Sequence, residues 1–344
     1  MSLPALDVRN LAVEFDTYGG TVQAVRDVSF TLEQGRTLAI VGESGCGKSV
    51  TVQSLMGLVP MPPGRITSGS AKLFGDEILG LSQQQLNAYR GKRIGMIFQD
   101  PMSALNPTMT IGRQIAETLV VHRGMGGTEA QQEAVDLLGL VQIPEPGRRA
   151  RQYPFEFSGG MLQRAVIAMS IACKPEVLIA DEPTTALDVT IQAQILTLLR
   201  ELQSSQGLSI ILITHDLGVV ARMAHDVCVM YAGKIVESGS VDDIFYRSAH
   251  PYTLGLRAAM PSNRRDRQRL QTIPGSPPDL FAPPAGCGFF ERCPHAMQLC
   301  ALQQPPQFGG NPGATHRSAC WLQHADCPTG PLHRLDVATK ERQP

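Results

Sequence analysis

The feature that most constrains this chain is a glycine-rich segment placed between a short apolar strand and a helix. Residues 42–49 read GESGCGKS and fit the pattern G-x-x-x-x-G-K-[ST]. The pattern predicts a strand at Thr37–Val41, a tight loop, and a helix from Lys48 to about Leu58. Glycines let successive backbone N–H groups curl around phosphate oxygens, and the helix N-terminus adds partial positive charge. The segment therefore predicts a phosphate loop.

Two side chains of this loop have expected roles toward a nucleotide. Lys48 would reach the β- and γ-phosphates, and the Ser49 hydroxyl would bind Mg²⁺. An ordinary glycine-rich turn is the alternative, and Cys46 is most simply a small loop residue. The residues expected to contact ATP in this segment are Gly42, Ser44, Gly45, Cys46, Gly47, Lys48, Ser49 and Val50.

Strand-like and helix-like segments alternate over the first 240 residues. Strands are expected at Leu6–Phe15, Val25–Leu32, Val177–Ala180 and Ile210–Ile213, a helix at Ile191–Gln203, and a hairpin at Val227–Tyr231 and Lys234–Ser238. Short apolar strands separated by helices indicate a parallel sheet covered on both faces. Residues 83–165, rich in Gln, Leu and Ala, are expected to form a helical insert. The predicted fold class is α/β: a phosphate-loop NTPase sheet with an antiparallel β subdomain and this insert.

Composition narrows the classes of protein. The 30 Lys and Arg residues balance 31 Asp and Glu residues, which gives no support to a nucleic-acid binder with a broad positive surface. The longest apolar run, Val227 to Ala232, is far shorter than the about 20 residues of a membrane-spanning helix. The N-terminal residues do not have the charged start and apolar core of a secretory signal. We therefore expect a soluble chain located in the cytoplasm.

A second candidate site is the pair of carboxylates after the apolar strand Val177–Ala180. In a nucleotide site, Asp181 would hold Mg²⁺ and Glu182 would polarise the attacking water as a general base. Two acids after a buried strand can also be loop residues or a helix cap. The phosphate loop in the same chain favours the catalytic interpretation.

The sequence FSGGMLQR at 157–164 resembles the signature motif of ATP-binding cassette (ABC) ATPases, with Phe for Leu and Met for Gln relative to its commonest form. Other elements of that family follow in the expected order. Gln99 resembles the Q-loop glutamine, Ala186-Leu187-Asp188 the D-loop, and His215 the switch histidine. Phe15 matches the A-loop aromatic that stacks on adenine, with Tyr18 as the second choice. The resemblance covers about residues 5–260.

This resemblance implies a mechanism in which two cassettes pair head to tail. Ser158, Gly159, Gly160 and Gln163 would contact the ATP bound by the partner subunit. Ser49, Gln99 and Asp181 would serve Mg²⁺, while Glu182 and His215 would be catalytic. ATP would close the pair and hydrolysis would reopen it, which would move two transmembrane permease subunits. The chain would then work at the cytoplasmic face of the cell membrane.

The C-terminal part has a different composition and holds most of the cysteines. We expect an ABC ATPase domain at 1–260 and a Pro- and Cys-rich extension at 261–344. His250-Pro251-Tyr252-Thr253 and the segment GCGFFERCP at 286–294 resemble the C-terminal extension of oligopeptide and dipeptide importer ATPases. The Arg264–Arg269 cluster is better explained as a solvated linker than as a lipid-binding patch.

Closely spaced cysteines in a cytoplasmic chain indicate metal binding rather than disulfides. The gaps between them contain no C-x-x-C pair, which disfavours zinc. We infer a [4Fe–4S] cluster held by Cys287, Cys293, Cys300 and Cys320, with zinc as the alternative metal and Cys327 as a spare thiol. His295 and His316 are possible substitutes, and unligated thiols in a loose tail remain the simpler alternative.

These features favour the ATPase of a peptide importer that pairs with a second, homologous cassette and acts indirectly with an extracytoplasmic peptide-binding protein. An importer of nickel or another small solute is the alternative within the same group. A soluble cassette protein of DNA repair or translation fits less well, because such chains carry two cassettes or a long coiled-coil insert. An electron-transfer role for the cysteines has no second redox motif to support it.

Overall fold

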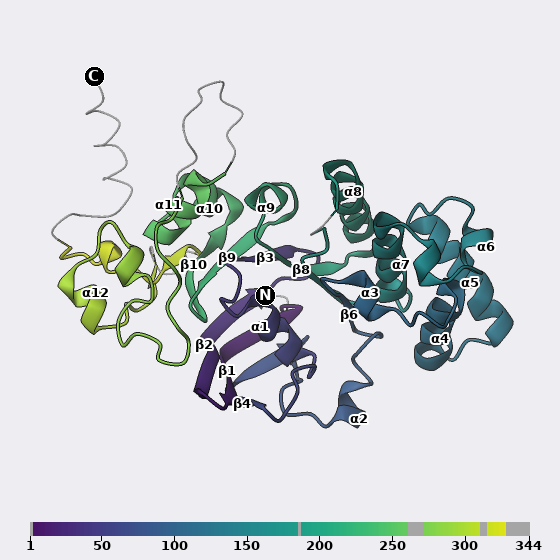
Figure 1. Cartoon of the computed structure of the whole chain (residues 1–344), viewed down its shortest axis with the longest axis horizontal. Coiled ribbons are helices and arrows are strands. Elements are labelled where there is room, and N and C mark those ends of the chain that lie inside the picture. Colours follow the sequence, from purple (N-terminus) through teal and green to yellow (C-terminus); the bar gives the residue numbers. More distant parts are fainter. Residues whose placement is uncertain (1–2, 185–186, 261–271, 310–314, 328–344) are drawn as a thin grey trace, which may run out of the picture. The chain divides into compact units, whose positions relative to one another are not determined.

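The computed structural model describes residues 3–184, 187–260, 272–309 and 315–327, and its chain forms two compact units. Unit 1 contains residues 1–6, 31–37 and 72–213, and unit 2 contains residues 7–30, 38–71 and 214–344. Both units are therefore built from separate stretches of sequence. Figure 1 labels their helices and strands.

Unit 1 consists of a three-stranded parallel arrangement and a group of helices. Its elements are β5 (Asp76–Glu77), α2 (Gln83–Leu86), β6 (Ile94–Ile97), α3 (Pro101–Ala104), α4 (Ile111–Arg123), α5 (Gly127–Leu140), α6 (Pro146–Arg149), α7 (Gly159–Ile171), β7 (Val177–Asp181), α8 (Val189–Gln206) and β8 (Ser209–Thr214). Strand β7 pairs in parallel with β6 on one side and with β8 on the other. Every residue of these three strands is buried, as expected for a sheet covered on both faces.

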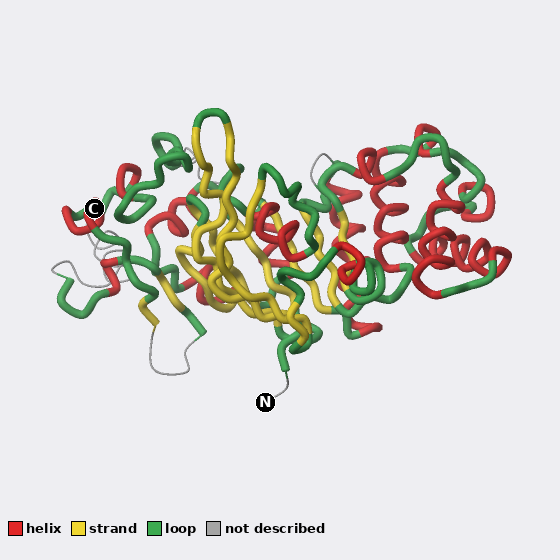
Figure 2. Tube along the Cα trace, turned by 90° about the horizontal axis from the view of Figure 1, so that it is seen from below, coloured by secondary structure: helices red, strands yellow, loops and turns green. Residues whose placement is uncertain are grey.

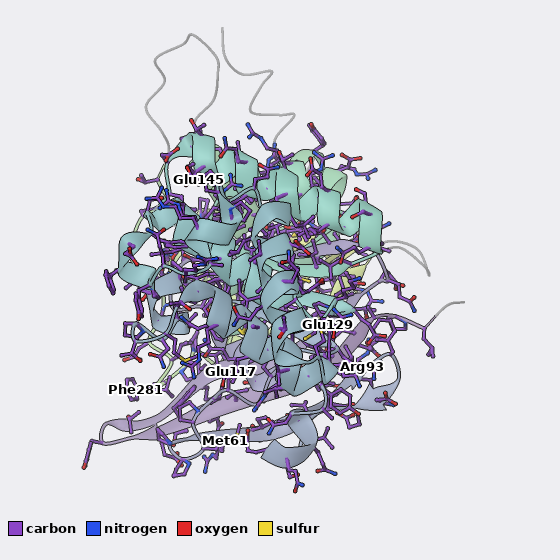
Figure 3. The ribbon with its side chains drawn as sticks, turned by 90° about the vertical axis from the view of Figure 1, so that its right-hand side faces the viewer. Met61, Arg93, Glu117, Glu129, Glu145 and Phe281 are labelled. Atoms are coloured by element: carbon purple, nitrogen blue, oxygen red, sulfur yellow. The ribbon has the colours of Figure 1, made fainter. Side chains whose placement is uncertain are left out.

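The helices α3 to α7 form one group, red in Figure 2, with a short 3₁₀ turn at Pro154–Glu156 before α7. Exposed glutamates mark the solvent side of this group: Figure 3 labels Glu117 on α4, Glu129 on α5 and Glu145 before α6. The opposite side of α4 and α5 is apolar and buried, since Ile115 and Leu119 of α4 and Leu138 of α5 are at most 1% exposed. This 3.6-residue periodicity is what made the insert recognisable in the sequence.

Unit 2 combines antiparallel strands with the phosphate-loop strand and the C-terminal extension. Its elements are β1 (Leu6–Thr17), β2 (Gly20–Leu32), β3 (Thr37–Val41), α1 (Lys48–Leu55), β4 (Gly64–Leu73), α9 (Leu217–Met223), β9 (Asp226–Tyr231), β10 (Lys234–Ser240), α10 (Val241–Tyr246), α11 (Pro251–Ala258), α12 (Gln298–Leu302), β11 (Phe308–Gly309) and β12 (Arg317–Ser318). Short 3₁₀ turns lie at Phe290–Arg292 and Trp321–Gln323. One sheet has the order β2-β1-β4-β5. In the other, β9 lies between parallel β3 and antiparallel β10, and β12 and β11 continue from β10.

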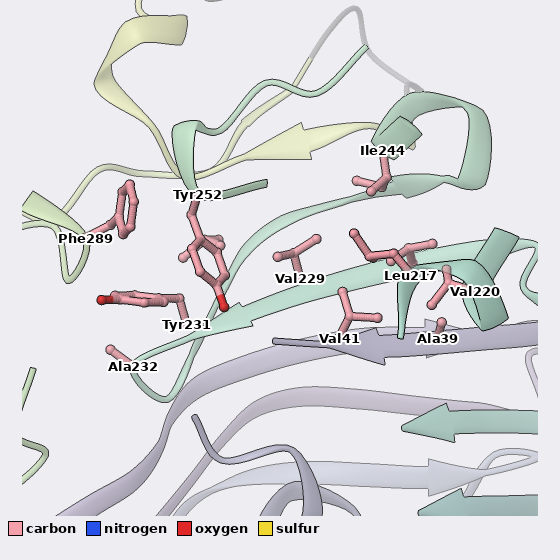
Figure 4. Packing of buried hydrophobic residues seen from close by; sticks show 12 residues of the cluster. Ala39, Val41, Leu217, Val220, Val229, Tyr231, Ala232, Ile244, Tyr252 and Phe289 are labelled. Atoms are coloured by element: carbon pink, nitrogen blue, oxygen red, sulfur yellow. The ribbon is translucent and has the colours of Figure 1, made fainter. Parts of the chain in front are cut away.

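Apolar residues from the ATPase part and from the C-terminal extension form one hydrophobic core in unit 2. Figure 4 shows Val41, Val229 and Ile244 in the same cluster as the rings of Tyr252 and Phe289. Phe289 contacts Tyr231 edge-on at 5.3 Å and Tyr252 at 5.4 Å between ring centroids. Burial of rings this large dominates the energetics of a core, so the extension folds with the ATPase part rather than beside it.

Two boundaries differ from the sequence-based expectations. The division expected at residue 260 does not separate compact units, because Phe289 shares a core with Tyr231 and Tyr252. The segment expected to form a helical insert, about 83–165, also contains strand β6, whose four residues are all buried. Such a short, continuous apolar run cannot be assigned to strand or helix by its periodicity alone.

The other elements that the sequence predicts are present, with ends that differ by a few residues. Helix α1 ends at Leu55 rather than Leu58, and α8 extends from Val189 to Gln206. Gly207 ends α8 in the left-handed region at φ 67°, which is the usual conformation of a C-terminal glycine cap. Within the described residues, no helix is both long enough and apolar enough to cross a membrane.

Candidate functional site

The phosphate loop of unit 2 has the strand–loop–helix geometry that the sequence predicts. Strand β3 ends at Val41, and α1 begins at Lys48 immediately after Gly47. Gly47 has φ 100°, and a Cβ atom there would overlap the carbonyl oxygen of Ala24. A Cβ atom on Gly42 would likewise overlap the carbonyl oxygen of Met230. Only glycine fits at these two positions, because the loop backbone packs directly on neighbouring strands.

Lys48 lies within the curl of this loop. Its side chain is 5% exposed, and Nζ donates hydrogen bonds of 2.9 Å to the carbonyl oxygens of Gly42 and Glu43. Cys46 is also buried, and this burial raises the pKa of its thiol although the nearby Lys48 charge opposes the shift. Cys46 is therefore a packed, neutral loop residue.

Glu43, the second residue of the loop, is held from two directions. Its backbone N–H donates to the hydroxyl oxygen of Tyr252 at 2.9 Å, and its carboxylate pairs with Arg292 at 2.8 Å. Tyr252 is fully buried in the core described above. The sequence singled out neither contact, because both partners lie more than 200 positions from Glu43 and no local pattern connects them.

Two further predicted site residues belong to unit 2. Phe15 is half-buried on β1, whereas Tyr18 is fully exposed at the turn between β1 and β2. His215 is exposed between β8 and α9, where Asp216 caps α9 by accepting a 2.7 Å hydrogen bond from the Gly218 N–H. The cap fixes the first residue of α9, and His215 lies directly before this cap, after the last residue of β8.

Unit 1 brings together Gln99, Asp181 and Glu182 at the ends of adjacent parallel strands. Asp181 is the last residue of β7 and is 3% exposed. The Gln99 side chain, which follows β6, donates from Nε2 to Glu182 Oε2 at 3.1 Å. Glu182 has φ 47°, and a non-glycine residue in this region costs about 1 kcal/mol or more. Its N–H donates to the carbonyl oxygen of Ile213 at 2.9 Å, which holds the backbone in this conformation.

The predicted signature lies at the start of α7 in unit 1. Ser158 is the N-cap of the helix, and its Oγ accepts from the Met161 N–H at 3.4 Å. Ser158 and Gly159 are exposed, while Phe157 before them is 8% exposed and anchors the turn. Gly160 lies close to Ile191, since a Cβ atom on it would come within 2.9 Å of Ile191 Cγ2.

Gln163 differs from the rest of the signature. Its side chain is 2% exposed, and its Nε2 has no hydrogen-bond partner among the residues that the structure describes. Of the predicted D-loop, Ala186 lies outside the described residues. Asp188 is the N-cap of α8 and accepts from the Ile191 N–H at 2.9 Å.

The four cysteines predicted as cluster ligands line a single pocket in the extension. Cys287, Cys293, Cys300 and Cys320 surround it together with His250, His295, Phe289 and Trp321. Cys287 lies before the 3₁₀ turn Phe290–Arg292 and Cys293 directly after it, Cys300 lies in α12, and Cys320 lies after β12. Cys327 does not line the pocket, but it packs against a small cluster formed by Cys320 and Leu322, as do Leu254 and Met297. His316 lies elsewhere, since its Nε2 donates to Glu237 Oε1 at 2.8 Å.

Burial strongly affects the ionisation of the groups around this pocket. It raises the pKa of Cys287, Cys320 and Cys293, the last to about 11. It lowers the pKa of His250 to about 3, so the ring is neutral at pH 7. His250 Nδ1 accepts from the Tyr252 N–H at 3.1 Å, which assigns the proton of the neutral ring to Nε2. Among the described residues, this buried Nε2 has no hydrogen-bond partner.

A site for a single metal ion is not formed here. No group of three or more His, Cys, Asp or Glu side chains in the described ranges is arranged to hold a metal ion. The cysteine pocket therefore has thiol donors, but they do not converge closely enough to form a site for a metal ion.

Comparison with known proteins identifies the class to which this fold and these motifs belong. An ABC transporter family model matches residues 25–185, which include the phosphate loop and the Asp181–Glu182 pair. A solved structure titled as the dimeric structure of MJ0796, a bacterial ABC transporter cassette, has a TM-score of 0.62 at 26% sequence identity. The matched region covers 69% of this chain and 98% of the MJ0796 chain. The protein is thus an ABC-type ATPase.

Closer relatives narrow the class to one family. A model of the oligopeptide/dipeptide transporter C-terminal region matches residues 236–300. The oligopeptide transport ATP-binding protein OppD of Bacillus subtilis is 55% identical over 94% of this chain and 90% of its own length. The dipeptide transport ATP-binding protein DppD of the same organism is 54% identical over 92% of this chain and 94% of its own length. The chain belongs to this family of oligopeptide and dipeptide transporter ATP-binding subunits.

Proposed function

We propose that this chain couples ATP hydrolysis to the uptake of dipeptides or oligopeptides through two transmembrane permease subunits at the cytoplasmic face of the membrane. The observation that carries this proposal is the match of residues 236–300 to the oligopeptide/dipeptide C-terminal region, joined to an ABC ATPase in one chain. The names of the relatives agree with it. Uptake of nickel or another small solute is the alternative, because the solute is chosen by a binding protein and permeases outside this chain.

In this proposal each predicted residue has a separate role in ATP binding or hydrolysis. The glycines at 42, 45 and 47 cradle the phosphates, Lys48 neutralises them, and Phe15 stacks on adenine. Ser49, Gln99 and Asp181 serve Mg²⁺, Glu182 is the general base and His215 contacts the γ-phosphate. The hydrogen bond from Gln99 to Glu182 supports this division, because it links the magnesium-sensing residue to the base.

A second cassette completes each site in the proposed assembly. Ser158, Gly159 and Gly160 would contact the ATP of the partner subunit, with Gln163 behind them. The exposure of Ser158 and Gly159 at the start of α7 supports this role, since helix N-termini favour anions. One solved structure of the similar MJ0796 cassette is described as dimeric. Another is described as a dimeric post-hydrolysis state bound to ADP and Pi. We expect a homologous second gene product as the partner rather than an identical copy.

The test is reconstitution of the chain with two permeases, a second cassette and the extracytoplasmic binding protein in vesicles. We expect ATP-dependent accumulation of a labelled dipeptide or oligopeptide, and ATPase activity that rises with peptide. Accumulation of nickel without peptide would establish the alternative solute. Full, solute-stimulated ATPase activity of the dilute chain alone would refute the shared site.

We also propose a [4Fe–4S] cluster in the extension, ligated by Cys287, Cys293, Cys300 and Cys320. Two observations support it: the four cysteines line one pocket, and the buried His250 Nε2–H lines the same pocket, where a cluster sulfur would accept its hydrogen bond. Ligation would also stabilise a segment rich in Pro and poor in core residues. Anaerobically purified protein should absorb near 400 nm and contain about four irons per chain. One zinc per chain and no iron would replace the cluster by the alternative metal.

A further inference from the structure

Arg292 lies in the short 3₁₀ turn of the C-terminal extension and reaches the phosphate loop. It is 249 positions from Glu43, yet its Nη1 donates to Glu43 Oε2 at 2.8 Å. The Arg292 side chain is 7% exposed and that of Glu43 is 26% exposed. An exposed ion pair contributes little to the stability of a protein, because water screens the two charges. The pair of Arg292 and Glu43 is largely shielded from solvent.

Hydrogen bonds and two aromatic rings fix the position of the Arg292 guanidinium. Nε donates to the carbonyl oxygen of Pro274 at 2.9 Å, and Nη2 donates to that of Ile273 at 3.3 Å. Nη1 also donates to the Tyr231 hydroxyl at 3.0 Å, and the group lies over the rings of Tyr231 and Phe289. Burial lowers the pKa of Arg292, but the hydrogen bonds that it donates to Glu43 and Tyr231 outweigh this effect and raise the pKa overall. The position of this charge is therefore set by the extension.

Glu43 transmits that position to the loop. Its N–H is fixed by Tyr252, its carboxylate by Arg292, and its carbonyl oxygen accepts from Lys48 Nζ at 2.9 Å. The same Lys48 ammonium also binds the carbonyl oxygen of Gly42. A shift of Glu43 would therefore move the two carbonyl groups that orient Lys48.

We propose that Arg292 is a positioning residue for nucleotide binding: through the Glu43 carboxylate it holds the first turn of the phosphate loop, and with it Lys48, in place. The C-terminal extension thereby determines the ATP affinity of the cassette. Arg292 does not touch the nucleotide in this scheme.

The experiment is a double-mutant cycle in the full-length chain with R292Q, E43Q and the double variant. The dissociation constant for Mg-ATP is measured by titration with a fluorescent ATP analogue, and kcat and KM by ATPase assay of the assembled transporter. We expect each single variant to raise the dissociation constant about tenfold, to raise KM in parallel, and to change kcat much less. The double variant should be no weaker than either single one, because both remove the same contact.

Two controls separate this role from a general loss of stability. R247Q removes a similar ion pair, Arg247 to Asp243 at 2.7 Å, whose arginine is 68% exposed, and should leave the ATP affinity unchanged. R292K keeps the charge but not the planar fork, and should recover part of the affinity. E43Q tests the same contact from the loop side if R292Q does not fold. Unchanged ATP affinity in E43Q, or losses that add in the double variant, would overturn the proposal.

Discussion

The phosphate loop and the cysteine pocket of unit 2 are assembled in opposite ways. The loop is one run of sequence, 42–49, whose shape depends on glycines at positions where a Cβ atom would collide with a strand. The pocket draws on residues from 250 to 322, with His250 from the start of α11 and cysteines from three later segments. A contiguous motif carries its own geometry, whereas a dispersed site exists only after the chain has folded.

The two regions are nevertheless joined by a short path of contacts. Tyr252, two residues after His250, accepts from the Glu43 N–H, and Arg292, next to Cys293, pairs with the Glu43 carboxylate. Residues next to the cysteine pocket thus hold Glu43 of the phosphate loop in place. The following predictions test how far each region depends on the other, starting with the largest expected effect.

The largest effect is expected at Glu182, which belongs to a short contiguous motif. Glu182→Gln removes the proposed general base but keeps the side-chain shape, so ATP hydrolysis should fall by about 10²–10⁴-fold. ATP binding should persist, because Lys48 and the glycines are unchanged. Single-turnover hydrolysis and nucleotide titration in the assembled transporter measure the two quantities. Near-normal turnover would remove Glu182 from the catalytic role.

Alanine substitutions of two loop glycines should distinguish the energetic cost of a strained backbone from the cost of a steric clash. Gly47→Ala places a Cβ atom against the Ala24 carbonyl oxygen at φ 100°, and should lower the free energy of unfolding by more than about 2 kcal/mol and abolish ATP binding. Gly45→Ala is the matched control. It also has a positive φ, 78°, but its Cβ would meet no atom of the described residues within 4 Å, so a loss of about 1 kcal/mol is expected. Denaturant unfolding checks both, and equal losses would show that strain alone governs the loop.

Variants of the cysteines test the dispersed region. Cys293→Ser and Cys300→Ser should abolish the absorbance near 400 nm and lower the melting temperature of the protein, because the metal contributes folding free energy. Cys327→Ser should do neither, since Cys327 is not among the residues that line the pocket. ATP should still bind to all three variants, and no more weakly than to R292Q. Loss of colour in Cys327→Ser alone would contradict the assigned ligand set.

The smallest effect is expected from the hydroxyl group that joins the two regions. Tyr252→Phe keeps the ring in the core but removes the acceptor of the Glu43 N–H, so a loss of about 1 kcal/mol in unfolding free energy is expected. Tyr246→Phe, at a tyrosine that is 80% exposed, is the control and should change little. A Tyr252→Phe protein with wild-type stability would show that water replaces the hydroxyl at the loop.

The accuracy of the sequence-based predictions follows the same division. Most strands and the phosphate loop of the ATPase part were predictable because their signals are local, namely apolar runs and glycine spacing. Strand β6 was missed because four buried residues between helices show no distinguishing periodicity. The change in composition near residue 260 predicted an extension, but it does not reveal which core the ring of Phe289 joins.

By itself, the sequence determined the class of this protein, since the motif residues that would meet ATP lie in short runs whose backbone geometry is dictated by their own glycines and caps. Only the tertiary structure decided what surrounds those runs. It placed Arg292 against Glu43, buried Gln163 although it lies within the signature, and brought four cysteines around one pocket with His250. Such contacts arise from side-chain packing between segments distant in sequence, and packing is settled by the whole core rather than by any local pattern.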